Sequence, residues 1–187
     1  MDIMSLYMKA KDTNKPTSTI YSELGQTKPF DRVDRELAVV ILRTGDVLHH
    51  SISRALDPWG LSNEQYNALR ILRGAGDEGR PTLDVSTRLI SRSPNITRLL
   101  DKLISKGLAR RDRDAEDRRQ ALVRITPEGR ALLERCDGAV DAVLGKLQTL
   151  DASEMRHVVG LLDRIRSAVA VTTVSEGLRG RKTSETT

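Results

Sequence analysis

The feature that most constrains the fold of this chain lies between Ser91 and Gly129, where it reads SRSPNITRLLDKLISKGLARRDRDAEDRRQALVRITPEG. Apolar residues in its first half recur at i, i+3, i+4, i+7 and i+8, the spacing of one buried helix face; they are Ile96, Leu99, Leu100, Leu103 and Ile104. Ser93 can cap this helix, Pro94 suits its first position, and Gly107 can end it. We therefore predict a short helix from Pro94 whose outer face is polar and positively biased.

Two short strand patterns follow this helix and predict a hairpin, the first from Leu108 to Arg111 and the second from Ala121 to Ile125. The connection, Asp112 to Gln120, is too polar for the core, and residues 110–119 contain five arginines and four acids. Such a charge run can be a solvated hairpin with local ion pairs. Because it follows a helix that fits the major groove of DNA, we favour a wing whose arginines enter the minor groove.

The order of these elements resembles the MarR family of bacterial winged-helix regulators. The resemblance rests on the wing sequence DRDAEDRR and on T-P-x-G at the start of a long helix, and it extends from about Asp34 to Val171. Its specific residues are Arg113, Asp114, Asp117, Arg118, Arg119, Thr126, Pro127 and Gly129. It implies a mainly α fold with a small β-ribbon wing, in which a winged helix-turn-helix domain joins N- and C-terminal helices that form a dimer.

Helix patterns on both sides of this module set the predicted boundaries. Residues 31–56 carry apolar side chains at helical spacing up to Asp57-Pro58, and Ser62 with Gln65 has the spacing of a capping box. Thr126 can cap a later helix, and Asp151 with Glu154 can cap the last one. We predict a flexible N-terminal arm (1–30), a dimerisation helix (31–60), the winged helix-turn-helix domain (61–128), dimerisation helices (129–171) and a disordered tail (172–187).

The outer helices carry more leucine and valine than a small winged domain can cover, so we expect a homodimer; the alternative is a monomer with a larger core. A net charge of +5 over 187 residues favours an anionic partner. No apolar run approaches the roughly 18–20 residues of a membrane span, and the N-terminus lacks the order of a secretory signal. With a single cysteine, the chain fits the reducing cytoplasm.

Catalytic, metal and redox sites are not predicted. Cys136 lies on the apolar stripe of its helix and is expected to be a small core residue. His49 and His50 are adjacent and would point about 100° apart on a helix, so together they cannot easily hold a metal. The chain has no glycine-rich phosphate loop and no G-x-S-x-G motif. We therefore expect a protein that is not an enzyme and has no cofactor.

We expect a homodimeric, sequence-specific transcriptional regulator that represses from a palindromic operator. Asn95, Thr97 and Arg98 are predicted at or near base edges. The predicted phosphate contacts are Ser91, Arg92, Ser93 and Lys102. In the wing, Arg118 and Arg119 contact DNA and Asp117 orients one of them. Pro94 and Arg113 complete the predicted DNA-binding set. The alternative is a winged helix that binds proteins and no operator.

The resemblance also implies an effector site for small aromatic acids or phenols, where the first two helices and the start of the fifth meet the winged domain. Trp59 and Tyr66 could supply aromatic surface there. Arg43, His50 and Arg70 could meet a carboxylate. The alternative is that Trp59 and Tyr66 only pack the helix junction, because buried aromatic side chains are ordinarily core.

Overall fold

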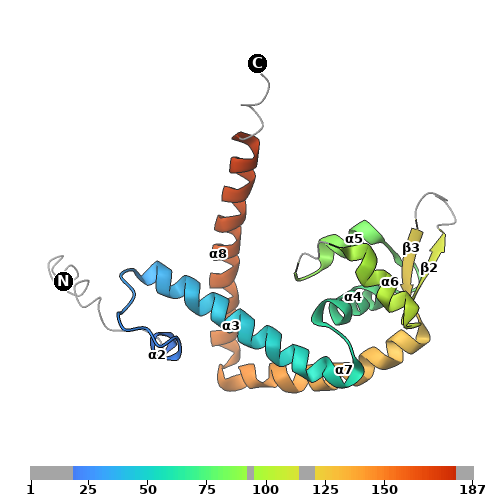
Figure 1. The fold of residues 1–187 in the computed structure, drawn as a ribbon, viewed down its shortest axis with the longest axis horizontal. Coiled ribbons are helices and arrows are strands. Elements are labelled where there is room, and N and C mark those ends of the chain that lie inside the picture. The colour runs from blue at the N-terminus through green and yellow to red at the C-terminus, as the bar shows by residue number, and fades with distance from the viewer. Residues whose placement is uncertain (1–18, 92–94, 114–120, 180–187) are drawn as a thin grey trace, which may run out of the picture. The chain divides into compact units, whose positions relative to one another are not determined.

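The computed structural model describes residues 19–91, 95–113 and 121–179, and for Arg113 and residues 171–179 the backbone alone (Figure 1). The chain divides into two compact units, residues 1–140 and 141–187. The mainly helical fold with one small antiparallel sheet agrees with the predicted class. None of the helices in the described ranges is long and apolar enough to cross a membrane.

The first long helix, α3 (Val33–Leu56), continues into a 3₁₀ turn, η1 (Asp57–Trp59). The α-helix ends at Leu56, before Pro58, as predicted, because Pro58 has no backbone N–H to continue the helical hydrogen bonds. A short helix, α2 (Ile20–Glu23), precedes α3, and its Ile20 side chain is buried. The predicted flexible arm over residues 1–30 is therefore wrong for this part, since burial of Ile20 orders it.

Helix α4 (Asn63–Gly74) begins with the predicted capping box. The backbone nitrogen of Gln65 donates to Ser62 Oγ at 3.2 Å, and the backbone nitrogen of Ser62 donates to Gln65 Oε1 at 3.1 Å. These bonds satisfy two N–H groups that a helix start leaves without partners. The opposite face places Leu69 and Leu72 in the core with no exposed surface.

Helices α5 (Thr82–Arg88) and α6 (Ile96–Ser105) form a helix-turn-helix. The predicted start of α6 at Pro94 is wrong, since α6 begins at Ile96 and Asn95 is its N-cap. Asn95 Oδ1 accepts a hydrogen bond from the backbone nitrogen of Arg98 at 3.0 Å. Asparagine is as effective a cap as serine, so the helix can begin after Asn95. Ser93 and Pro94 lie outside the described residues.

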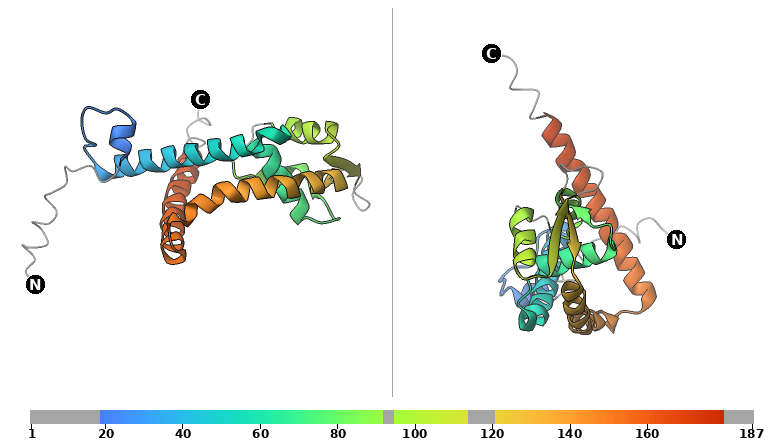
Figure 2. Two further views of the ribbon diagram at one scale, coloured as in Figure 1. Left: turned by 90° about the horizontal axis from the view of Figure 1, so that it is seen from below. Right: turned by 90° about the vertical axis from the view of Figure 1, so that its right-hand side faces the viewer.

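Strands β2 (Ala109–Arg113) and β3 (Ala121–Ile125) form the predicted antiparallel hairpin, and Figure 2 shows α6 beside them. A third strand, β1 (Arg80–Pro81), pairs with β3 and was not predicted, because two residues are too short for a strand pattern. Gly79 precedes β1 with φ +70°, and a Cβ there would lie 2.6 Å from Arg124 Cγ. Only glycine allows β1 to approach β3 so closely.

Helix α7 (Pro127–Leu144) follows β3 and begins with the predicted Thr126 cap. Thr126 Oγ1 accepts a hydrogen bond from the backbone nitrogen of Gly129 at 3.0 Å. Gly129 packs against the carbonyl of Leu108 so closely that a Cβ would overlap it. Further along α7 the core side chains are Leu133, Cys136 and Val140. The burial of Cys136, which raises its thiol pKa, confirms it as a core residue.

In the second unit, a 3₁₀ turn, η2 (Gly145–Thr149), leads to α8 (Ala152–Arg179). The predicted Asp151–Glu154 cap is present, because Asp151 Oδ1 accepts from the backbone nitrogen of Glu154 at 2.9 Å and Glu154 Oε2 accepts from that of Asp151 at 2.8 Å. The predicted tail over 172–187 begins too early, since α8 continues to Arg179. That segment contains no proline to end the helix.

Candidate nucleic-acid interface

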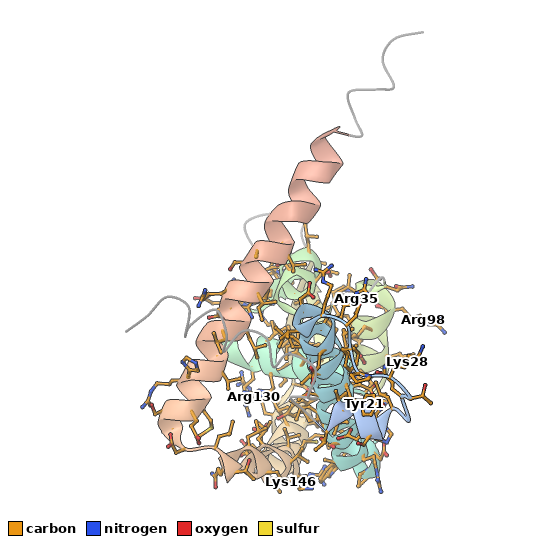
Figure 3. All side chains as sticks on the ribbon, turned by 90° about the vertical axis from the view of Figure 1, so that its left-hand side faces the viewer. Tyr21, Lys28, Arg35, Arg98, Arg130 and Lys146 are labelled. Carbon is orange, nitrogen blue, oxygen red and sulfur yellow. The ribbon has the colours of Figure 1, made fainter. Side chains whose placement is uncertain are left out.

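The outer face of α6 presents polar and basic side chains because the inner face supplies the core. Leu100 and Leu103 have no exposed surface, whereas Thr97, Arg98 and Lys102 are exposed. Arg98 extends away from the ribbon in Figure 3. With Asn95 Oδ1 engaged as the cap, its amide nitrogen can still donate to a base. The described residues predicted to contact base edges therefore share one end of one helix.

A salt bridge joins this helix to the wing. Arg111 Nη2, on β2, donates to Asp101 Oδ1, on α6, at 2.9 Å. Asp101 lies on the exposed part of a helix whose neighbouring side chains are basic, so an unpaired carboxylate there would repel phosphate. Neither Arg111 nor Asp101 was among the predicted DNA-binding residues. They are ten positions apart in different elements, so no local spacing pattern links them.

A second set of contacts fixes the base of the wing. Arg124 donates from Nη1 to Asp112 Oδ2 at 2.9 Å and from Nε to the Asp77 carbonyl at 2.7 Å. Arg110 Nε lies 3.4 Å from the same Asp112 carboxylate. Asp112 and Arg124 are diagonal neighbours on paired strands, so the strand register could have suggested this pair. Arg124 is only 20% exposed and therefore serves the wing's structure.

A cluster of two arginines around one carboxylate joins β1 to α5. Asp84 accepts from Arg80 Nη1 at 2.7 Å and from Arg88 Nε at 2.9 Å. These bonds, with the Arg80 contact the larger cause, hold the pKa of Asp84 below its ordinary value. With two arginines and one carboxylate, the cluster keeps one net positive charge where β1 meets α5, and the first helix of a helix-turn-helix is the one that crosses the DNA backbone. Its i, i+4, i+8 spacing is a signal that the sequence analysis missed.

The remaining predicted DNA-binding residues are placed only in part. Ser91 is exposed in the turn before α6. The Arg113 backbone pairs with Ala121 at the end of β2. Arg92, Ser93, Pro94, Asp117, Arg118 and Arg119 lie outside the described residues.

Two of the five predicted effector residues lie together. Tyr66 is 6% exposed, and its hydroxyl donates to Asp137 Oδ1 on α7 at 2.7 Å. Arg73 Nη1 donates to Asp137 Oδ2 at 2.6 Å, and the Arg70 guanidinium lies 5.8 Å from the centre of the Tyr66 ring. Burial opposes ionisation of Asp137, but the hydrogen bonds from Tyr66 and Arg73 outweigh it and lower its pKa. These contacts give Tyr66 a packing role between α4 and α7.

The other three predicted effector residues have different surroundings. Arg43 is exposed on α3, and its Nη1 lies 3.5 Å from Asp46 Oδ2 on the same helix. His50 is exposed, and Trp59 is half-buried in η1. The turn after Trp59 contacts the C-terminal end of α6, because Lys106 Nζ donates to the Gly60 carbonyl at 2.6 Å.

Comparison with known proteins agrees with this geometry. A family model for a winged helix DNA-binding domain matches residues 61–129, which run from the residue before the α4 cap to the first turn of α7. The HTH-type transcriptional regulator TtmR of Methylorubrum extorquens is 27% identical over 152 residues, covering 81% of this chain and 74% of TtmR.

Solved structures show the same fold. CouR from Rhodococcus jostii bound to p-coumaroyl-CoA is 26% identical with a TM-score of 0.64, covering 73% of this chain and 95% of CouR. A mutant of MarR from E. coli complexed with operator DNA is 26% identical with a TM-score of 0.63, covering 70% of this chain and 93% of that one. The similarity thus extends beyond the winged domain.

Proposed function

Because this chain belongs to the MarR family of winged helix-turn-helix transcriptional regulators, we propose that it is a homodimeric repressor that leaves a palindromic operator when a small aromatic or phenolic ligand binds. The observation that carries DNA recognition is the exposed basic end of α6, held against the wing by the Asp101–Arg111 salt bridge. Asn95, Thr97 and Arg98 read base edges in the major groove, while Lys102 and Ser91 bind phosphates.

The wing completes each half-site. Arg118 and Arg119 reach the minor groove, where negative potential is focused, and Asp117 orients one of them. The strand contacts of Arg124 support this proposal, since they give the wing a firm base. The complex of E. coli MarR with operator DNA supports it as well, because that protein shares the fold.

The dimer is proposed from the apolar surface of the outer helices. On α8 the exposed large apolar side chains include Val158, Val159, Leu161 and Leu162, and on α3 they are Val33, Leu37, Leu42 and Val47. Apolar surface of this extent on a free chain indicates a partner. A second copy is the partner that also explains a two-fold operator, because each copy supplies one α6.

Effector control is proposed to act through the junction of α3, α4 and α7. Tyr66 and Arg70, with Trp59, Arg43 and His50, are the proposed ligand residues, and CouR bound to p-coumaroyl-CoA supports an aromatic ligand. A ligand that binds the DNA-incompetent arrangement more tightly releases the operator by shifting populations. The contact from Lys106 to Gly60 offers a direct link between this junction and the end of α6.

Selection of bound duplexes from a randomised library, followed by footprinting, tests the DNA-binding proposal. We expect a near-palindrome with half-sites about 10–10.5 base pairs apart, bound by one dimer as measured by light scattering. Arg118→Ala or Arg119→Ala should weaken binding and reduce its salt dependence by about one ion, whereas the exposed α8 control Arg156→Ala should not. A monomer, or a site without two-fold symmetry, would contradict the proposal.

A panel of aromatic acids and phenols tests the effector proposal. Compounds that release the operator should change Trp59 fluorescence, and Arg70→Ala should weaken their effect while operator affinity without ligand stays unchanged. Tyr66→Phe removes the hydroxyl bonded to Asp137 but keeps the aromatic ring. It therefore distinguishes the effect of losing the Asp137 contact from the effect of losing ring contact with the ligand. If active compounds leave the fluorescence unchanged and act normally on both variants, the site lies elsewhere.

Failure of the wild-type protein to bind any DNA duplex would instead favour the alternative function, a winged helix that binds proteins and no operator.

A further inference from the structure

Ile90, in the turn between α5 and α6, is 88% exposed, the largest exposed fraction among the large apolar side chains in the described ranges. Leu89 before it is 8% exposed and has extended backbone, with φ −62° and ψ 139°. Successive side chains along extended backbone point to opposite sides, so Leu89 enters the core and Ile90 points outward.

The backbone of Ile90 is fixed in this position. Its N–H donates to Asn67 Oδ1, on α4, at 2.9 Å. Asn67 thus ties the turn to the helix beneath it, and the buried Leu89 side chain holds it from the other side. The outward direction of Ile90 therefore follows from two separate contacts with the core of the winged domain.

The surroundings of Ile90 identify the partner that would cover it. The turn leads to Ser91 and the Asn95 cap, and the exposed side chains on the two flanking helices include Arg88 and Arg98. An exposed isoleucine in the turn between the helices of a helix-turn-helix, next in the chain to the basic exposed face of α6, suits a polyanion that also presents an apolar group. In the major groove of DNA that group is the C5-methyl of thymine, which proteins recognise through apolar side chains.

We propose that Ile90 packs against the C5-methyl group of a thymine in each half-site and so helps to determine operator sequence. This proposal rests on the proposed operator binding and adds a residue outside the polar set of α6. A protein partner or a second copy would fit the basic face of α6 less well, because Arg98 would then need an acidic counterpart, whereas Arg88 is already bonded to Asp84.

The test is a thermodynamic cycle between the side chain and the methyl group. In the selected operator, each thymine is replaced in turn by uracil, which removes only the C5-methyl. For wild type we expect one position per half-site where uracil weakens binding roughly fourfold, the effect of exposing one methyl group. In Ile90→Ala the same replacement should change affinity by less than about twofold, with Ile90→Val between the two.

Leu83→Ala is the matched control, since Leu83 is 75% exposed but lies on α5, away from the turn and from the proposed dimer surface. Its uracil profile should match that of wild type. The proposal is overturned if wild type shows no sensitive thymine, or if the uracil effect persists in full in Ile90→Ala. A shift of Ile90→Ala to another oligomeric state with an unchanged uracil profile would also overturn it. If wild type binds no duplex, the proposed function itself fails.

Discussion

Leucines on α6 and α8 lie in opposite environments. Leu100 and Leu103 of α6 have no exposed surface, whereas Leu161 and Leu162 of α8 are 41% and 39% exposed. The first pair belongs to the core of the first unit, to which α4, α5, α6 and the sheet contribute. The second pair belongs to a helix of the second unit, on which large apolar side chains are exposed.

This difference separates folding from assembly. The winged domain is part of a unit with a buried core, so its stability should depend on the packing of that core. The exposed leucines of α8 gain stabilisation only when another surface covers them. A substitution in α6 should therefore change unfolding, and one in α8 should change self-association. Substitutions in the two regions test whether folding and self-association depend on different leucines.

The largest effect is expected for Leu100→Ala. Leu100 is fully buried, so truncation leaves a cavity and should lower the free energy of unfolding by about 2–5 kcal/mol. Urea denaturation followed by circular dichroism measures this loss. Leu83→Ala, at a leucine 75% exposed on α5, is the control and should stay within about 0.5 kcal/mol of wild type. Equal losses in both variants would mean that stability does not depend on the packing of this core.

Leu162→Asp should weaken self-association by roughly a hundredfold, about 2.7 kcal/mol, because it places a charge in the proposed dimer surface. Sedimentation or light scattering over a range of concentrations measures the effect. Hydrogen exchange of α4 and α6 should stay as in wild type. Ser167→Asp, at another exposed position of α8, is the charge-matched control. Loss of protection in α6 would show that the two regions fold as one.

The winged domain was predictable because its signals are local. The Ser62–Gln65 capping box, the apolar stripe of α6 and the alternation of β3 each lie within a few residues, and the structure contains all three. The start of α6 was misplaced because Ser93 and Asn95 are both good caps, and sequence alone does not choose between them. Strand β1 was missed because it exists only through pairing with β3.

The contacts that organise the candidate sites were less predictable, because they join distant positions. Asp137 meets Tyr66 across 71 residues, and Arg111 meets Asp101 between a strand and a helix. Local patterns carry no information about such pairs. Ile90 shows the converse, since isoleucine is among the residue types most often buried while the fold leaves Ile90 exposed.

A smaller effect is expected at Asp137, where α7 meets α4 near the end of the first unit. Its pKa in the folded chain lies below the ordinary value of 3.8, so the ionised form stabilises the fold above that pH. This contribution should be lost as the pH falls below about 4 toward the lowered folded pKa.

Asp137→Asn should therefore be less stable than wild type at pH 7, by about 1–2 kcal/mol, and should lose less stability between pH 5 and pH 3. Urea denaturation at several pH values gives both curves. Asp141→Asn, on an exposed residue one turn along α7, is the control. Parallel curves for Asp137→Asn and wild type would mean that α7 is not tied to the winged domain through this carboxylate.

The smallest effect on stability is expected for the salt bridge between α6 and the wing. Asp101 and Arg111 are 52% and 37% exposed, so their coupling in a double-mutant cycle should be only about 0.2–1 kcal/mol. Operator affinity should respond differently. Arg111→Ala leaves the Asp101 carboxylate unpaired beside the DNA and should weaken binding, whereas Asp101→Ala removes that acid and should not.

The double variant Asp101→Ala/Arg111→Ala distinguishes two roles for the arginine, with fluorescence anisotropy on the selected operator as the measurement. If Arg111 acts by neutralising Asp101, removing the acid as well should recover most of the affinity lost in Arg111→Ala. If Arg111→Ala is equally damaging with and without Asp101, then Arg111 contacts DNA directly. A contact of this kind would contribute little to the free energy of unfolding and more to operator affinity.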